Sequence, residues 1–279
     1  MDFVPPMLQK TLQKTEYWGE VQAANIPSKS HKCVAVEGDC AFDKNKPRAE
    51  VEYFESLNQV HDAPLVGGIV AYLPMEEGPN VVGPFLKAMA KRRMVKGIRR
   101  MFQYEASNPD FILQPKMVES IKLLAEYDLS FDVCVVQEQL SQVTQLAEAC
   151  PKVSFVLDHL GKPAIKNSPS GTVNKEWATG IIELAECSNV HAVKISGLIT
   201  EANLDSWTRR DIEPYICHVV KTFGVDRCIF GSDWPILKLA GDYQRWVTVL
   251  TNVLLDNNLY TVDNIDMFFS GNAERVYRL

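Results

Sequence analysis

The chain lacks the features of a disulfide-stapled, zinc-ribbon or membrane-spanning protein. It has seven cysteines, but none form a C-x-x-C pair and the odd number leaves one thiol over in any disulfide scheme. This pattern is typical of reduced thiols in a cytoplasmic protein. No apolar run approaches the roughly 18 residues that a membrane-spanning helix needs, and the first residues contain no apolar signal segment. We therefore expect a cytoplasmic protein without a membrane partner.

An excess of positive charge is also absent. The formal net charge is −6, and the most basic segment, KAMAKRRMVKGIRR (residues 87–100), is interrupted by Met and Ala at helical spacing. That spacing is typical of a solvated helix face, and an acidic chain without a Lys/Arg run is a poor match for a polyanion. The sequence predicts no nucleic-acid partner and favours a small-molecule substrate.

Seven short apolar runs rich in Val and Ile organise the chain. They read as nearly continuous apolar segments, which is typical of parallel strands covered on both faces. Segments with helical periodicity separate them, the clearest over residues 211–223, which ends before Gly224. This alternation predicts parallel βα units. The runs are CVAVEG from residue 33, VGGIVAYLP from 66, VKGIRRMF from 95, FDVCVV from 131, VSFVLDHLG from 153, HAVKISG from 191 and RCIFGSDWP from 227.

Two α/β architectures fit this order: a closed (β/α)8 barrel and an open doubly wound sheet. No linker divides the chain, so we expect one domain over residues 1–279, with an atypical N-terminal segment over residues 1–30. A dinucleotide-binding sheet requires a glycine-rich turn after its first strand, and the first run offers only Gly38. A barrel carries its chemistry at the carboxyl ends of the strands.

Charged and polar residues collect at those strand ends. Because neighbouring residues of a strand point to opposite faces, only one of Arg99 and Arg100 can point inward. Buried charges are costly unless they are paired or functional, so their convergence at one end of a sheet predicts a site for a polar ligand. The candidates are Glu37, Asp39, Arg99 or Arg100, Asp158, His159, Lys194 and Asp233.

Each candidate also has a purely structural interpretation. Asp233 could cap a following helix, and His159 could be a satisfied core histidine. Lys194 could extend its ammonium group to solvent or pair with Asp158. For the site to be purely structural, a separate structural interpretation would have to hold at each of several strand ends. The gathering of these residues at one end of the sheet therefore favours a functional site.

Four motifs, FVLDHLGKP, VKISGLITEA, FGVDRCIFGSDWP and GNAERVYRL, occur in this order between residues 66 and 279. In sequence and spacing this part of the chain resembles the amidohydrolase-related (amidohydrolase 2) family. Within it, the chain is most similar to the sugar-lactonase-like branch of metal-dependent hydrolases with the TIM-barrel fold. The resemblance implies a hydrolase of lactones or amides, with one divalent metal such as zinc or with none.

The resemblance also implies roles for individual residues. Asp233 of GSDWP would be the general base for an attacking water, and a metal ligand where a metal is bound. His159 of DHLGKP would bind that metal or polarise the substrate carbonyl. Arg99 would anchor a substrate carboxylate or hydroxyl, Lys194 is a weaker candidate for the same contact, and Trp234 would line the site.

The chain departs from the family at its N-terminus. The family's first strand carries a His-x-His pair, whose two imidazoles face the barrel axis and suit a divalent metal. No two of the five histidines are separated by a single residue, and residues 1–30 contain no Val/Ile-rich strand. We expect a barrel that lacks or replaces its first strand, through truncation, an alternative start or loss of that strand. Its unpaired edges would favour a homo-oligomer.

Two hypotheses about function follow. The first is a hydrolase that opens a cyclic ester, such as a sugar-acid lactone, by water attack with Asp233 as the base. The second is a catalytically impaired or truncated barrel that acts as a binding or scaffold protein. The missing His-x-His pair favours the second hypothesis, and the intact DHLGKP and GSDWP motifs favour the first.

Overall fold

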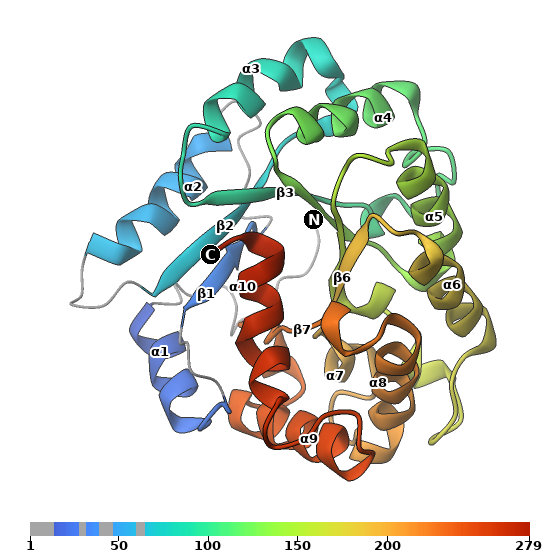
Figure 1. Cartoon of the computed structure of the whole chain (residues 1–279). Coiled ribbons are helices and arrows are strands. Elements are labelled where there is room, and N and C mark those ends of the chain that lie inside the picture. The colour runs from blue at the N-terminus through green and yellow to red at the C-terminus, as the bar shows by residue number, and fades with distance from the viewer. Residues whose placement is uncertain (1–13, 28–31, 39–46, 60–64) are drawn as a thin grey trace.

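The computed structural model describes residues 14–27, 32–38, 47–59 and 65–279. These residues form a seven-stranded parallel sheet in the order β1-β2-β3-β4-β5-β6-β7, so each strand pairs with its sequence neighbours (Figure 1). All seven predicted strands are confirmed. They are β1 Cys33–Val36, β2 Val66–Tyr72, β3 Val95–Met101, β4 Ser130–Cys134, β5 Phe155–Leu157, β6 Val190–Ile195 and β7 Cys228–Phe230.

The sheet curls but does not close. Figure 1 shows most of the helices around its outside and α10 in the middle of the view, and among the residues that the structure describes no pairing joins β1 to β7. The predicted barrel short of one strand is therefore confirmed. The helices are α1 Lys14–Ala23, α2 Pro47–Ser56, α3 Pro79–Met89, α4 Pro115–Lys122, α5 Leu140–Ala149, α6 Lys175–Glu186, α7 Leu198–Glu201, α8 Arg209–Phe223, α9 Tyr243–Asp256 and α10 Asn272–Tyr277.

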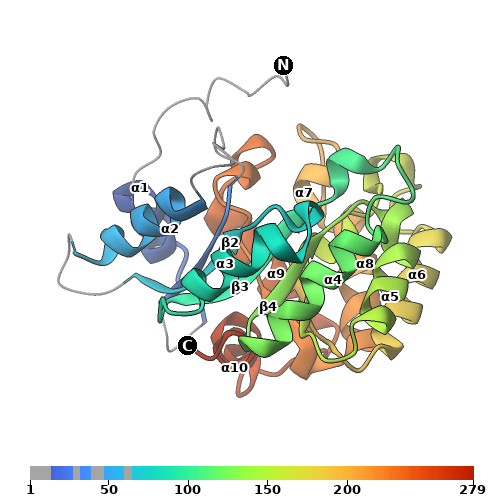
Figure 2. The ribbon, with the colours of Figure 1, turned by 90° about the horizontal axis from the view of Figure 1, so that it is seen from above.

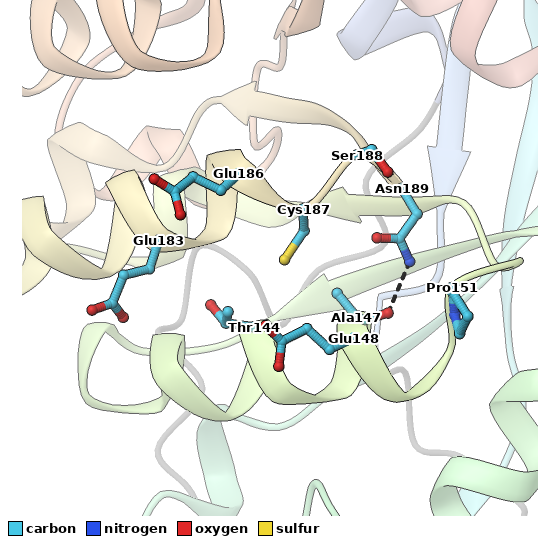
Figure 3. Close-up of a pocket in the computed structure, with 9 residues that line it drawn as sticks. All are labelled: Thr144, Ala147, Glu148, Pro151, Glu183, Glu186, Cys187, Ser188 and Asn189. Atoms are coloured by element: carbon cyan, nitrogen blue, oxygen red, sulfur yellow. Dashed lines mark hydrogen bonds between the residues drawn. The ribbon is translucent and has the colours of Figure 1, made fainter.

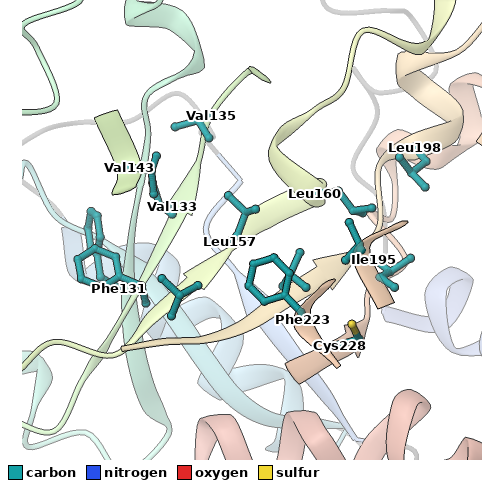
Figure 4. Packing of buried hydrophobic residues seen from close by; sticks show 14 of the residues in the cluster. Phe131, Val133, Val135, Val143, Leu157, Leu160, Ile195, Leu198, Phe223 and Cys228 are labelled. Carbon is teal, nitrogen blue, oxygen red and sulfur yellow. The ribbon is translucent and has the colours of Figure 1, made fainter. Parts of the chain in front are cut away.

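Strand alternation divides the core into two parts. Side chains such as Phe131, Leu157 and Ile195 point outward and pack under the helices in the larger cluster (Figure 4). The opposite face carries a smaller cluster inside the curl, which includes Val156 and Ile229. The polar strand-end residues share this inner face. The helix predicted over residues 211–223 is confirmed as α8, which ends at Gly224 with φ 81°.

The C-terminal helix closes the amino-terminal end of the sheet. Tyr277 of α10 belongs to the inner cluster, and Lys96 Nζ donates to the Arg278 carbonyl oxygen at 2.9 Å. The buried Asn272 donates from Nδ2 to the carbonyl oxygens of Val225 (2.8 Å) and Cys228 (2.9 Å), which caps the start of the last strand. Figure 2 shows α10 and α7 at opposite ends of the sheet. The GNAERVYRL motif therefore holds this end of the sheet together.

The N-terminal segment is helical where it is described. Helix α1 contacts α9, and the Tyr17 ring lies 5.2 Å from the ring of Trp234. Glu20 forms an ion pair with Lys238. Each cysteine within the described ranges is a free thiol. In the described part of the chain no helix combines the length and the apolar character needed to cross a membrane.

Asn272→Ala should lower the free energy of unfolding by roughly 1–3 kcal/mol, because the buried Cys228 carbonyl oxygen loses the Asn272 amide donor and the Val225 carbonyl oxygen keeps only the Tyr260 hydroxyl. Urea denaturation followed by circular dichroism measures this. Glu274→Ala, on an exposed position of the same helix, is the matched control and should change stability by less than about 0.5 kcal/mol. Equal stability of the two variants would show that the side-chain amide does not stabilise the strand edge.

Candidate active site

The carboxyl ends of β5, β6 and β7 bring the principal candidates together. His159 follows β5 and Asp233 follows β7, and His159 Nε2 lies 3.7 Å from Asp233 Oδ1. Ser196 follows β6, and its Oγ lies 2.7 Å from His159 Nδ1. The side chains of His159 and Asp233 are 11% and 16% exposed, so both keep some accessible surface. The two residues expected to carry the chemistry thus face one another.

The backbone around both residues is unusual. Residues 159–162 all lie in the left-handed region, with φ of 51° at His159 and 46° at Lys162, and Asp233 has φ 57°. Such conformations cost of order 1–3 kcal/mol each in residues other than glycine, and they persist where the surroundings fix them. Trp177 fixes the first turn by donating from Nε1 to the Leu160 carbonyl oxygen at 2.7 Å. Strained positions of this kind are enriched at functional sites.

A network of buried charges lies beside His159. Arg99 Nε lies 2.8 Å from Glu37 Oε1, and Arg99 Nη1 lies 2.9 Å from Asp158 Oδ2. Lys194 Nζ lies 2.5 Å from Asp158 Oδ1 and 2.6 Å from Asp132 Oδ2. All five side chains are buried. The structure therefore places Arg99 inward. It also pairs Lys194 with Asp158, which is one of the structural interpretations that the sequence offered for Lys194.

The network sets the charge states of these groups. Although burial opposes it, the charges of Lys194 and Arg99 hold the pKa of Asp158 well below its ordinary value. Burial lowers the pKa of His159, and the Asp233 and Asp158 carboxylates oppose this shift only in part. His159 is therefore a neutral imidazole at pH 7, next to an ionised Asp158.

Trp234 lies at the rim of the site. Its ring packs against Tyr17, and its buried Nε1 has no hydrogen-bond partner in the part of the chain that the structure describes. Arg100, the alternative to Arg99, points outward and pairs with Glu76 at 3.1 Å. Asp39, His31 and His61 lie outside the described residues.

Three residues of the site were not singled out as candidates from the sequence. Asp132 is fully buried, and Tyr277 donates from its hydroxyl to Asp132 Oδ2 at 2.6 Å. An acid inside the apolar run FDVCVV is a signal that could have identified Asp132, because a buried acid requires a partner. Ser196 and Tyr277 lie inside the VKISGLITEA and GNAERVYRL motifs, but no local pattern distinguishes either residue as part of the site.

The donor atoms available to a metal are few. Atoms of Cys134, Asp158 and His159 lie within 4.8 Å of one another. Both oxygens of Asp158 are already paired with cationic groups, and burial raises the pKa of the Cys134 thiol to about 12. A zinc site in an enzyme takes three protein ligands. In the described ranges only His159 and Asp233 remain as uncommitted donors facing one another, so these residues do not fit a zinc centre.

A separate pocket lies at the other end of the sheet. It has a volume of about 490 Å³ and is lined by residues such as Glu148, Glu183 and Glu186 (Figure 3). Asn189, which precedes β6, donates across it to the Ala147 carbonyl oxygen at 3.0 Å. Because His159 follows β5 whereas this pocket adjoins the starts of β5 and β6, it is not part of the His159 site.

Comparisons with known proteins agree with this architecture. The sequence model of the family described as Amidohydrolase matches residues 53–279. An L-fucono-1,5-lactonase from Burkholderia ambifaria is 34% identical over 197 residues, which are 70% of this chain and 65% of the relative. The matched part thus spans slightly less than two thirds of that relative's length. An L-rhamnono-gamma-lactonase from Scheffersomyces stipitis is 24% identical over 238 residues, covering 77% of this chain and 70% of the relative.

Solved structures share the fold. An amidohydrolase from Burkholderia multivorans, crystallised with bound zinc, matches with a TM-score of 0.81 at 24% identity, covering 98% of this chain and 90% of that chain. A probable 2-pyrone-4,6-dicarboxylic acid hydrolase from Acinetobacter baumannii matches with a TM-score of 0.69 at 14% identity, covering 95% and 88%.

Lys194→Met should lower the free energy of unfolding by about 3–5 kcal/mol, because it leaves Asp132 and Asp158 buried with one cation fewer. Urea denaturation at neutral pH measures the loss. The matched control is Lys122→Met, which removes a solvent-exposed pair with Glu119 and should leave the unfolding midpoint unchanged. A similar midpoint for both variants would contradict a stabilising role for the buried network.

Proposed function

The chain belongs to the amidohydrolase family, and from that premise we propose that it hydrolyses a cyclic ester, namely a sugar-acid lactone. The observation that carries the proposal is the convergence of His159 and Asp233 at the carboxyl ends of two strands. The two relatives named as sugar-acid lactonases support the substrate class.

The proposed reaction begins with a water molecule beside Asp233. The water oxygen bonds to the lactone carbonyl carbon while the Asp233 carboxylate accepts a proton from the water. The neutral imidazole of His159 donates a hydrogen bond to the carbonyl oxygen as it becomes negatively charged. The bond from the carbonyl carbon to the ring oxygen then breaks, and the alkoxide takes the proton held by Asp233. The product is the open-chain hydroxy acid.

The substrate would be held by side chains around this pair. Trp234, which is partly exposed, offers an apolar wall at the rim. Arg99 and Lys194 are both 8% exposed. They would contact the substrate only with the N–H groups that their acidic partners leave free. Their main effect on catalysis would be to keep Asp158 ionised beside His159.

The proposed reaction uses no metal step. Lactones are reactive esters, and the described donors do not form a three-ligand zinc site, because Asp158 is already neutralised by two cationic side chains. The competing hypothesis of a binding or scaffold protein rests on the absence of a His-x-His pair. The facing arrangement of His159 and Asp233 favours the hydrolase over it.

Asp233→Asn should reduce kcat for lactone opening by roughly 10²–10⁴-fold, the usual contribution of a positioned general base. Asparagine tolerates the left-handed backbone at this position, so the fold should persist. The assay is proton release from a panel of sugar lactones. Asp263→Asn, at an exposed position, should retain full activity. Undiminished hydrolysis by Asp233→Asn would exclude Asp233 as the base, and an inactive wild-type chain across the panel would favour the scaffold hypothesis.

Purified protein should contain substoichiometric zinc, and incubation with a chelator should leave its lactonase activity unchanged. The reason is the commitment of the Asp158 carboxylate to Arg99 and Lys194. Inductively coupled plasma mass spectrometry measures the metal content, with a zinc-loaded sample as the reference. Stoichiometric zinc that survives dialysis, together with activity lost to the chelator, would contradict the proposal.

A further inference from the structure

Ser196 contacts His159 directly but is closed to substrate. Its Oγ lies 2.7 Å from His159 Nδ1, and the residue is 1% exposed. A hydroxyl this deeply buried cannot meet a lactone carbonyl, so it is not a nucleophile. Any effect of Ser196 on the reaction must pass through the imidazole.

Two glycines place the hydroxyl and the ring in contact. A Cβ on Gly231 would lie 2.7 Å from Ser196 Cβ and 2.9 Å from its Oγ, so only glycine allows Ser196 to occupy this position. Gly197 has φ 66°, and a Cβ there would lie 2.9 Å from both Cγ and Nδ1 of His159. The ring of His159 is therefore fixed by a hydrogen bond at Nδ1 and by backbone packed against it.

The direction of the hydrogen bond follows from the neighbours of each group. Within residues 14–27, 32–38, 47–59 and 65–279, the Ser196 hydroxyl has no hydrogen-bond partner other than His159 Nδ1. A buried hydroxyl hydrogen requires an acceptor, and Nδ1 provides one only when the imidazole proton is on Nε2. Nε2 faces the Asp233 carboxylate at 3.7 Å, where an N–H is attracted and a lone pair is repelled.

We infer that Ser196 is a positioning residue, which donates to Nδ1 of His159 and thereby keeps the imidazole proton on Nε2, facing Asp233. The inference rests on the proposed function in one respect, namely that the Nε2–H group is the donor to the reacting carbonyl oxygen. The tautomer itself is a property of the free protein. This tautomer gives a reason for the serine and the two glycines on the Nδ1 side of His159, because the Nε2 side is the one that would face the substrate.

The first test measures the tautomer without substrate. ¹⁵N-histidine-labelled protein is examined by NMR at a pH at which His159 is neutral, with His159→Gln used to assign the signals. We expect wild type to show the Nε2–H form, and Ser196→Ala to show a mixture of tautomers because Nδ1 loses its donor. The matched control is Ser120→Ala, since Ser120 is fully buried and its Oγ has no partner among the described residues. It should leave the His159 signals unchanged.

Two NMR outcomes would overturn the inference. One is an Nδ1–H tautomer in wild type, and the other is an unchanged Nε2–H spectrum in Ser196→Ala. Ser196→Thr, which keeps the hydroxyl, should keep the wild-type tautomer. None of these spectra requires catalysis, so they test the tautomer even if the protein hydrolyses no lactone. A failure to hydrolyse any lactone would count only against the proposed function.

The second test measures turnover on a lactone that wild type hydrolyses. Ser196→Ala should lower kcat by roughly 10–100-fold, the range for residues that orient a functional histidine, with KM little changed because Ser196 does not touch the substrate. Ser196→Thr should restore most of the rate. A rise in KM at constant kcat, or a loss of rate in Ser196→Ala without a change in tautomer, would overturn the positioning role.

Discussion

The buried carboxylate of Asp158 is the group on which the interior of this protein depends. It is fully buried, and a carboxylate in that position is tolerated only when cations compensate it. Arg99 of β3 and Lys194 of β6 supply those charges, and they also bind Glu37 at the end of β1 and Asp132 in β4. One acid at the end of β5 thereby connects strands on both sides of it.

This constraint also places the candidate chemistry. His159 is the next residue, and its left-handed backbone turns the imidazole toward Ser196 and Asp233 while Asp158 stays in the network. The DHLGKP, KISG and GSDWP motifs therefore act as one unit. Gly231 makes room for Ser196, Ser196 contacts His159, and His159 faces Asp233. The GNAERVYRL motif supports the unit from the other end of the sheet, where Tyr277 donates to Asp132.

Much of the fold and part of the site could be predicted from the sequence. The seven strands followed from their apolar runs, and α8 followed from its periodicity, because both depend on residues close together in the chain. His159 and Asp233 could be expected to meet, since parallel strands place their carboxyl ends at one edge. Asp132 was missed, although an acid in an apolar strand indicates a paired charge. Ser196 was missed because its position depends on a glycine 35 residues along the chain, for which no local pattern exists.

The order of strands and helices, the end of the sheet at which polar residues gather, and the absence of a His-x-His pair can all be read from the residues in order. Three other features become visible only in the folded chain: which cation compensates which acid, that β1 and β7 stay unpaired within the described residues, and that Tyr277 reaches Asp132 across 145 residues. The physical reason is the range of the interactions. Strand and helix patterns arise from neighbouring residues, whereas the compensation of a buried charge depends on distances across the curled sheet.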